Sequence, residues 1–153
     1  MPSRLIDVRA ALIARIEALT PETEATRTYV YATNPRVSRT RTDNGGDSGD
    51  RNFWFTLPSG EPPSQWGDAV TIRTARFALV LRIANVGPDQ DLAWARAVNE
   101  ITHLANEIDR YVAHVGPWPA GVEEVVAQGW SEPEKKNNGY EVSLQIEATV
   151  EES

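Results

Sequence analysis

The fold class is decided by one stretch near the end of the sequence, Tyr140-Glu141-Val142-Ser143-Leu144-Gln145-Ile146-Glu147-Ala148-Thr149-Val150. Apolar and polar side chains alternate strictly along it. Because successive side chains of a strand point to opposite faces of a sheet, the run predicts a β-strand with one buried face and one wet, acidic face. The buried face requires other elements to cover it, and two segments upstream are suited to that.

Those two segments are predicted helices. The first runs from about Ser3, its N-cap, to Leu19, and its apolar face is Leu5, Val8, Leu12, Ile16 and Leu19. The second begins at Asp89 or Asp91 and ends near Val115, before Gly116-Pro117. Its apolar stripe is Trp94, Val98, Ile101, Ala105, Ile108, Val112 and Val115, with no inward-pointing polar residue in that stripe.

Further strands are predicted between the helices, at 27–33, 53–57 and 70–83, because these segments are rich in β-formers. A short helix is predicted from Val122 to Gln128, followed by a polar turn from Ser131 to Gly139. The order helix-strands-helix-strand predicts one α+β domain over residues 1–153. Its sheet should be mostly antiparallel and packed by the two main helices on one face.

Composition narrows the classes of function. The 153 residues carry a net charge of −7, and such an acidic chain disfavours specific binding of DNA or RNA. The sequence has no cysteine, which excludes disulfides and cysteine-based zinc sites. The N-terminus lacks the apolar region of a signal peptide, and no apolar run approaches the ~20 residues that span a bilayer. We therefore expect a cytosolic protein.

The sequence contains no HExxH, P-loop or GxSxG pattern. Its two histidines, His103 and His114, point away from the apolar stripe of the second helix, so they should be solvated. They are eleven residues apart, which is roughly 16 Å along a helix, so they cannot share a metal ion. Asp43, Asp47 and Asp50 lack the ligand spacing of a calcium loop. We accordingly expect no enzyme, no cofactor and no metal.

Contact surfaces are the remaining candidates. The segment 38–50 holds three glycines and no apolar residue, which predicts a mobile loop. Its basic residues precede acidic ones, so it could also pair with a neighbouring subunit. Tryptophans in predicted loops either plug the core or anchor an interface, whereas Trp94 is predicted to be core. The candidate interface residues are Arg36, Arg39, Arg41, Asp43, Asp47, Asp50, Trp66, Trp118 and Trp130.

The last strand is predicted to lie at an edge of the sheet. Glu141, Glu147 and Glu151 would then either block unwanted pairing with other strands or meet a neighbouring subunit that continues the sheet.

This layout resembles the tail terminator proteins of long-tailed bacteriophages. These are α+β subunits of similar length, with a first helix like Leu5 to Leu19, a second like Asp91 to Val115, and a last strand like Tyr140 to Val150. The resemblance implies a homohexameric ring that caps the tail tube and joins it to the head connector protein. DNA would pass through its lumen without specific binding. The subunit would be made in the host cytoplasm and end in the virion.

Two alternatives remain open. A head-completion or neck connector protein has the same size and class. A small ligand-binding or enzymatic α+β domain would hold its pocket between sheet and helix, lined by Phe53, Phe55, Trp94 and Tyr111. A polar group pointing inward among these residues would favour that alternative.

Overall fold

A computed structural model describes residues 4–21, 28–32, 50–56, 58–60, 64–66, 70–84, 90–136 and 139–152. The chain is an α+β fold with a mostly antiparallel sheet, as the sequence predicts. The predicted loop at 38–50 lies outside the described residues except for Asp50, where a strand begins.

The sheet is organised around β8 (Gly139–Glu152), the strand predicted from its alternation. β8 pairs antiparallel with β5 (Val70–Ala84) over almost its full length. The strand order is β1-β2-β5-β8-β6, completed by β1 (Thr28–Tyr31), β2 (Asp50–Phe55) and β6 (Val122–Trp130). β1 and β2 are parallel. Three short strands pair alongside: β3 (Ser59–Gly60) and β4 (Ser64–Trp66) with β5, and β7 (Glu134–Lys136) with β8.

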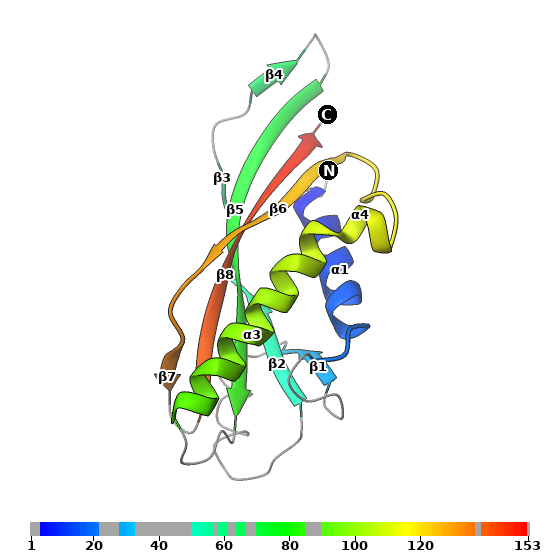
Figure 1. Cartoon of the computed structure of the whole chain (residues 1–153). Coiled ribbons are helices and arrows are strands. Elements are labelled where there is room, and N and C mark those ends of the chain that lie inside the picture. Colours follow the sequence, from blue (N-terminus) through cyan, green and yellow to red (C-terminus); the bar gives the residue numbers. More distant parts are fainter. Residues whose placement is uncertain are drawn as a thin grey trace.

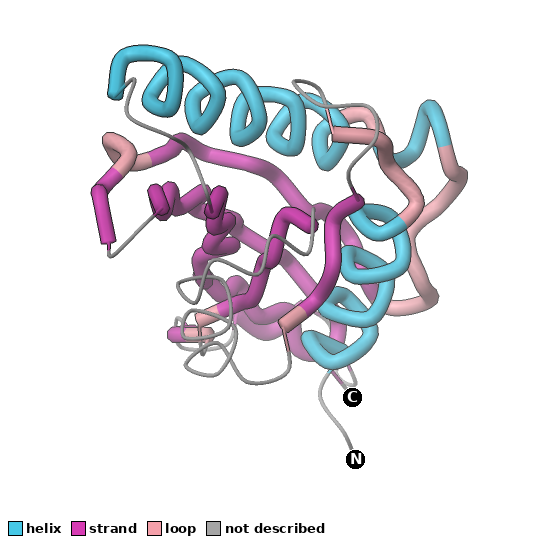
Figure 2. The backbone as a smooth tube through the Cα atoms, turned by 90° about the horizontal axis from the view of Figure 1, so that it is seen from below, coloured by secondary structure: helices cyan, strands magenta, loops and turns pink. Residues whose placement is uncertain are grey.

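Both main helices cover the same face of this sheet (Figures 1 and 2). They are α1 (Arg4–Glu17) and α3 (Gln90–Asp109), and a short helix α4 (Tyr111–His114) follows α3. The predicted second helix is therefore divided at Arg110, whose backbone leaves the helical geometry. The chain then leaves α4 through Gly116, whose φ of +132° is a conformation that glycine adopts without strain.

The core lies between this helical layer and the sheet. Its largest contributions come from the alternating apolar residues of the two central strands, all 7% exposed or less: Phe77, Leu79, Leu81, Ile83, Tyr140, Val142, Leu144, Ile146, Ala148 and Val150. α1 contributes its predicted face, with Val8, Leu12 and Ile16 fully buried. These faces agree with the periodicities of the sequence, two for strands and 3.6 for the helix.

Three predictions about elements are wrong. The predicted polar turn from Ser131 to Gly139 contains the short strand β7. The segment 122–128 forms the strand β6 instead of a short helix, because it pairs with β8 along its length. β8 itself is central, between β5 and β6, and is not an edge strand. Its glutamates therefore do not guard an edge, and the predicted acidic face is neutralised in part by arginines of β5.

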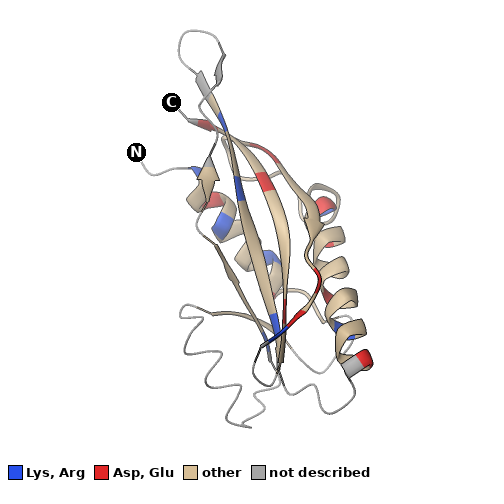
Figure 3. Cartoon of the chain, turned by 90° about the vertical axis from the view of Figure 1, so that its left-hand side faces the viewer, with Lys and Arg blue, Asp and Glu red and all other residues tan. Residues whose placement is uncertain are grey.

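The face of β5 and β8 turned away from the helices is called the polar face here, and is defined by Thr74, Arg76, Arg82, Glu141, Glu147 and Thr149. Basic positions of β5 lie beside acidic positions of β8 (Figure 3). Arg76 and Glu147 are partners in the register, with Nε and Oε2 3.0 Å apart. Arg82 and Glu141 are also partners, with Nη1 and Oε2 3.6 Å apart, and both are buried.

The two outer strands of the main order, β1 and β6, each carry a backbone N–H that a helix carboxylate caps. At the β1 edge, the N–H of Tyr31 donates to Oε2 of Glu17 at 3.2 Å. At the β6 edge, the N–H of Ala127 donates to Oδ1 of Asp109 at 3.1 Å. A capped N–H is not available to a strand from another molecule, so these positions disfavour growth of the sheet by strand addition.

Candidate functional site

The predicted interface residues are placed unevenly. Asp50 is the first residue of β2 and Trp66 the last residue of β4, and the structure describes only their backbone. The remaining loop residues, Arg36, Arg39, Arg41, Asp43 and Asp47, lie outside the described residues. The predicted contact between this loop and a neighbouring subunit stays a prediction.

Trp118 and Trp130 have different roles. Trp118 stacks on Tyr111, with ring centroids 3.7 Å apart and planes 8° apart, and it packs against the core. It is therefore one of the two alternatives that the sequence offered, a plug over the core. Trp130 is 47% exposed and is the last residue of β6, not a loop residue.

The prediction that Trp94 is a core residue is wrong, because its side chain is 46% exposed. The predicted stripe on the second helix is rotated relative to the true buried face. That face is built from smaller residues and one glutamate, namely Ala93, Ala97, Glu100, Ile101, Leu104, Ala105 and Ile108. Alanines permit close approach of the helix to the sheet, and this leaves the large ring of Trp94 on the flank.

The flank that carries Trp94 faces the β6 edge. At about 100° per residue, Trp94, Val98 and Asp109 lie within roughly 60° of one another around α3. Asp109 bonds to the backbone of Ala127 on β6. Trp94 and Trp130 therefore lie on the same side of the molecule, and we call Trp94, Trp130 and the exposed Glu132 the tryptophan edge.

A cleft lies toward the β1 and β2 end of the strand order, beneath the first two turns of α1. We call it the α1 cleft. Its volume is about 350 Å³, and its lining is Leu5, Ile6, Arg9, Tyr31, Phe55, Thr56, Pro58 and Phe77. The floor of the cleft is aromatic, because the ring of Phe55 contacts those of Tyr31 and Phe77, with centroids 6.1 Å and 5.7 Å apart. The volume is within the range of ligand pockets, roughly 300–1,000 Å³.

Arg9 gives this apolar cleft a positive charge. Its side chain is exposed and forms no hydrogen bond or ion pair with any residue in the described part of the chain. Ile6, at the same helix end, is 51% exposed. In the sequence, Leu5 and Arg9 lie one turn apart on the predicted helix. The residues of β1, β2 and β5 that complete the cleft are brought to them only by the fold.

Known protein families and curated proteins offer no match to this sequence.

A buried polar group joins α3 to the sheet. Glu100 is 0% exposed and its Oε2 accepts a hydrogen bond from the hydroxyl of Tyr29 on β1 at 3.0 Å. The Nε of Arg51 on β2, itself buried, is 3.7 Å from the same oxygen. The prediction of an apolar stripe without an inward-pointing polar residue therefore fails for the true buried face. Glu100 follows Ala93 by seven residues and Ala97 by three, and this helical spacing is the signal in the sequence that places it on the same face as those alanines.

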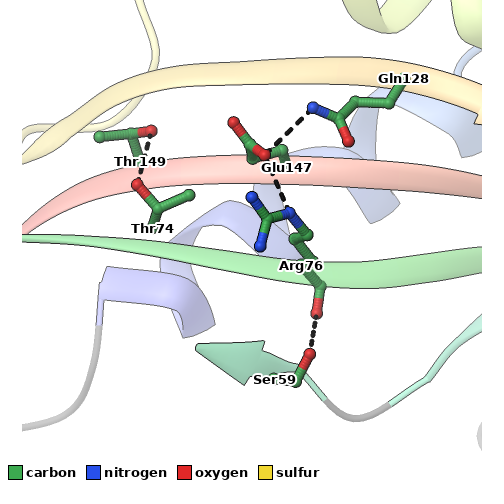
Figure 4. A network of polar contacts seen from close by, with 6 residues as sticks. All are labelled: Ser59, Thr74, Arg76, Gln128, Glu147 and Thr149. Atoms are coloured by element: carbon green, nitrogen blue, oxygen red, sulfur yellow. Dashed lines mark hydrogen bonds and ion pairs between the residues drawn. The ribbon is translucent and has the colours of Figure 1, made fainter. Parts of the chain in front are cut away.

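A second polar network lies on the polar face (Figure 4). The carboxylate of Glu147 receives hydrogen bonds from Nε of Arg76 at 3.0 Å and from Nε2 of Gln128 at 3.1 Å. The hydroxyls of Thr74 and Thr149 are 3.5 Å apart, again from β5 and β8. Because these groups bond across strands to one another, they support the register of the sheet.

The histidines differ from one another. His114 is exposed and its Nδ1 is 3.1 Å from Oε2 of Glu107, which also accepts a 2.6 Å hydrogen bond from Arg15 of α1. Burial raises the pKa of Glu107, but the hydrogen bonds from His114 and Arg15 together lower it by more. The pKa of Glu107 therefore lies below the ordinary value of 4.5. His103 is half-buried, which departs from the predicted solvated surface position.

Within the described ranges, no group of three or more histidine, aspartate or glutamate residues is arranged to hold a metal ion. None of the helices described there has both the length and the apolar character needed to cross a membrane. The exposed tryptophans of the tryptophan edge and the volume of the α1 cleft make these two the candidate surfaces of the described residues.

Proposed function

We propose that this chain is a structural subunit that assembles into a ring, of the kind formed by tail terminator proteins of long-tailed phages. One observation carries the proposal. Six large apolar side chains are about half exposed, between 45% and 58%, and association with another subunit could remove them from water: Ile6, Leu92, Trp94, Val112, Val115 and Trp130. Two of them, Trp94 and Trp130, are aromatic side chains of the kind that anchor protein–protein interfaces.

The capped N–H groups of β1 and β6 favour contact through side chains. Since Glu17 and Asp109 cap backbone N–H groups at the two edges, a neighbouring subunit cannot add a strand at those positions without displacing a carboxylate. The alternative in which a neighbour continues the sheet is thereby disfavoured. The exposed apolar side chains remain as the surfaces that association would bury.

The resemblance supplies the rest of the proposal. The ring would be a homohexamer that caps the tail tube and contacts the tube protein and the head connector protein. The net charge of −7 suits a lumen through which DNA passes without binding. A head-completion or neck connector ring would use the same exposed surfaces, and only its neighbours in the virion would differ.

The test is the assembly state of the purified chain at increasing concentration. Sedimentation velocity and negative-stain electron microscopy should show a ring, expected to be sixfold, for the chain alone or with tail-tube protein. Trp94→Glu should weaken assembly, whereas Asn106→Glu, at an exposed position of α3 away from the tryptophan edge, should not. A chain that stays monomeric at high concentration and forms no ring with the tube protein would refute the proposal.

A second candidate is a small ligand-binding domain, and the α1 cleft is the observation that favours it. Its lining is apolar apart from Arg9 and two hydroxyl-bearing residues, Tyr31 and Thr56. Such a lining suits a small carboxylate with an apolar body. Native mass spectrometry of the purified chain tests this, because a retained ligand adds a discrete mass that Arg9→Glu should remove.

A further inference from the structure

We infer that, in the ring proposed above, Trp130 of one copy docks in the α1 cleft of the next copy, with Glu132 of the first copy beside Arg9 of the second. The inference rests on the proposed function and adds to it the residues that join one subunit to another.

The first support is the placement of the two surfaces. The tryptophan edge belongs to β6 and to the flank of α3 above it, at one end of the strand order β1-β2-β5-β8-β6. The α1 cleft is lined by residues of β1, β2 and β5, toward the other end. Contact between two different surfaces of identical subunits is head-to-tail, and such contacts close into rings when the rotation between subunits permits.

The second support is apolar complementarity. Trp130 lies opposite Leu144 in the register, so it is on the helical side of the sheet, yet it remains 47% exposed. Tryptophan is a frequent anchor of interfaces, because a rigid ring buries about 150–250 Å² of surface. The α1 cleft offers it about 350 Å³ over a floor that includes the edge-to-face rings of Phe55 and Phe77. The side chain of Trp130 and the α1 cleft are therefore both suited to an apolar partner.

The third support is charge. Arg9 in the cleft has no ion pair with the described residues, and the same holds for Glu132, two residues beyond Trp130. Both side chains are exposed. A docked Trp130 would carry Glu132 toward the rim of the cleft, where opposite charges fix the orientation of the contact and increase the rate of association.

In the first experiment, each variant places a charge on one of the two surfaces and so blocks the contact from that side. Trp130→Glu should raise the concentration needed for assembly at least about 30-fold, as expected for an interface anchor. Ile6→Glu should do the same from the cleft side, since Ile6 is half exposed and its replacement leaves the core intact. Asn106→Glu is the matched control and should assemble like the native chain. Thermal unfolding monitored by circular dichroism checks that each variant is folded.

Mixing the two blocked variants gives the sharpest readout. The Trp130→Glu chain retains an intact cleft, and the Ile6→Glu chain retains an intact Trp130. Sedimentation velocity of the mixture should show a 1:1 dimer and no ring, because one productive contact remains. If Trp130 instead packed against its own symmetry mate, the Ile6→Glu chain would still associate by itself, and that result would overturn the inference.

The charge contact is tested by exchange. Arg9→Glu and Glu132→Arg should each weaken assembly about three- to tenfold at low salt, and the double variant should restore it, because the pair is recreated with reversed polarity. Failure of the double variant to recover overturns the pairing.

The outcomes separate the two proposals. A native chain that never assembles removes the proposed function and this contact together. A native ring that survives both Trp130→Glu and Ile6→Glu removes the contact alone. The same holds if native mass spectrometry finds a small molecule in the cleft whose removal leaves the ring unchanged.

Discussion

Replacement of Glu100 by glutamine should destabilise the fold far more than the same replacement at the exposed Glu124 of β6. Glu100 is 0% exposed, its Oε2 accepts the Tyr29 hydroxyl at 3.0 Å, and Arg51 is 3.7 Å away. Glutamine keeps the shape and an oxygen for Tyr29 but removes the charge opposite the buried Arg51. Breaking one partner of a buried pair costs about 3–5 kcal/mol.

Because glutamine retains part of the hydrogen bonding, we expect a loss in the free energy of unfolding near the lower limit, about 3 kcal/mol. For a domain of this size, that corresponds to a fall in Tm of about 6–12 °C. Urea unfolding monitored by tryptophan fluorescence measures the free energy of unfolding, and thermal unfolding monitored by circular dichroism measures Tm. Glu124→Gln is the matched control, because it removes the same charge from an exposed position, and it should change stability by less than about 0.5 kcal/mol.

A double variant refines the test. Replacing Arg51 by methionine and Glu100 by leucine removes both charges, so it should cost less than Glu100→Leu alone, which leaves Arg51 without this carboxylate. If Glu100→Gln and Glu124→Gln differ by less than about 1 kcal/mol, the buried carboxylate does not secure α3 to the sheet and the reasoning is refuted.

Three further predictions concern other parts of the fold. The contribution of Glu107 to stability should be fully present above the ordinary glutamate pKa and lost as the pH falls through its lowered folded value, so the difference in unfolding free energy between the native chain and Glu107→Gln should shrink from pH 6 to pH 3 in urea titrations. Asp109→Ala should leave the N–H of Ala127 uncapped and increase aggregation measured by light scattering, whereas Glu123→Ala on the same edge strand should not. Gly116→Ala should destabilise the chain by about 1 kcal/mol in urea unfolding, because alanine is strained at a φ of +132°, although its methyl group meets no atom within 4 Å.

The sequence was sufficient for the elements whose apolar period is undisturbed. β8 alternates along its length, β5 has apolar residues at every second position from Ala75 to Ile83, and α1 repeats its apolar residues every three to four positions, so the sequence predicts each within a few residues of its bounds. The α+β class and the helical layer on one face follow from these elements. In α1 and along most of β8 the periodicity reflects one buried face, and such burial is what sequence patterns record, whereas Ala78, Val80 and Arg82 of β5 are buried on the opposite face of the sheet as well.

β6 was missed because its alternation is interrupted. The pairing of β6 with β8 shifts between Val122 and Glu124 and again between Ala127 and Gly129. Each bulge adds a residue and moves the following side chains to the other face, so the apolar positions no longer recur every second residue. The order Val122-Glu123-Glu124-Val125-Val126 then imitates the spacing of a helix. Pairing with a neighbouring strand, which is a tertiary interaction, overrides that local pattern.

The candidate surfaces were harder to predict than the fold. On α3, the small residues Ala93 and Ala97 and the charged Glu100 mark the buried face, while the larger Trp94 lies on the flank. Hydrophobicity alone selects the tryptophan, because it cannot register that a glutamate is buried with Tyr29 and Arg51 or that alanine allows close packing. The sequence identifies Trp130 as a candidate, whereas Arg9 and the cleft beside it are recognisable only in the fold.

The central position of β8 has a consequence for how the protein is made. β8 pairs with β5, β6 and β7, and both α1 and α3 pack on it, yet it follows all of them in the chain. During synthesis, the apolar faces of both helices and the inner sides of β5 and β6 must therefore wait for the strand that joins them. A nascent chain that has not yet released Tyr140 to Val150 from the ribosome exposes those surfaces together, and this interval is when it is most prone to aggregate. Folding of the sheet should be a late and largely concerted event, dominated by contacts between residues distant in the sequence.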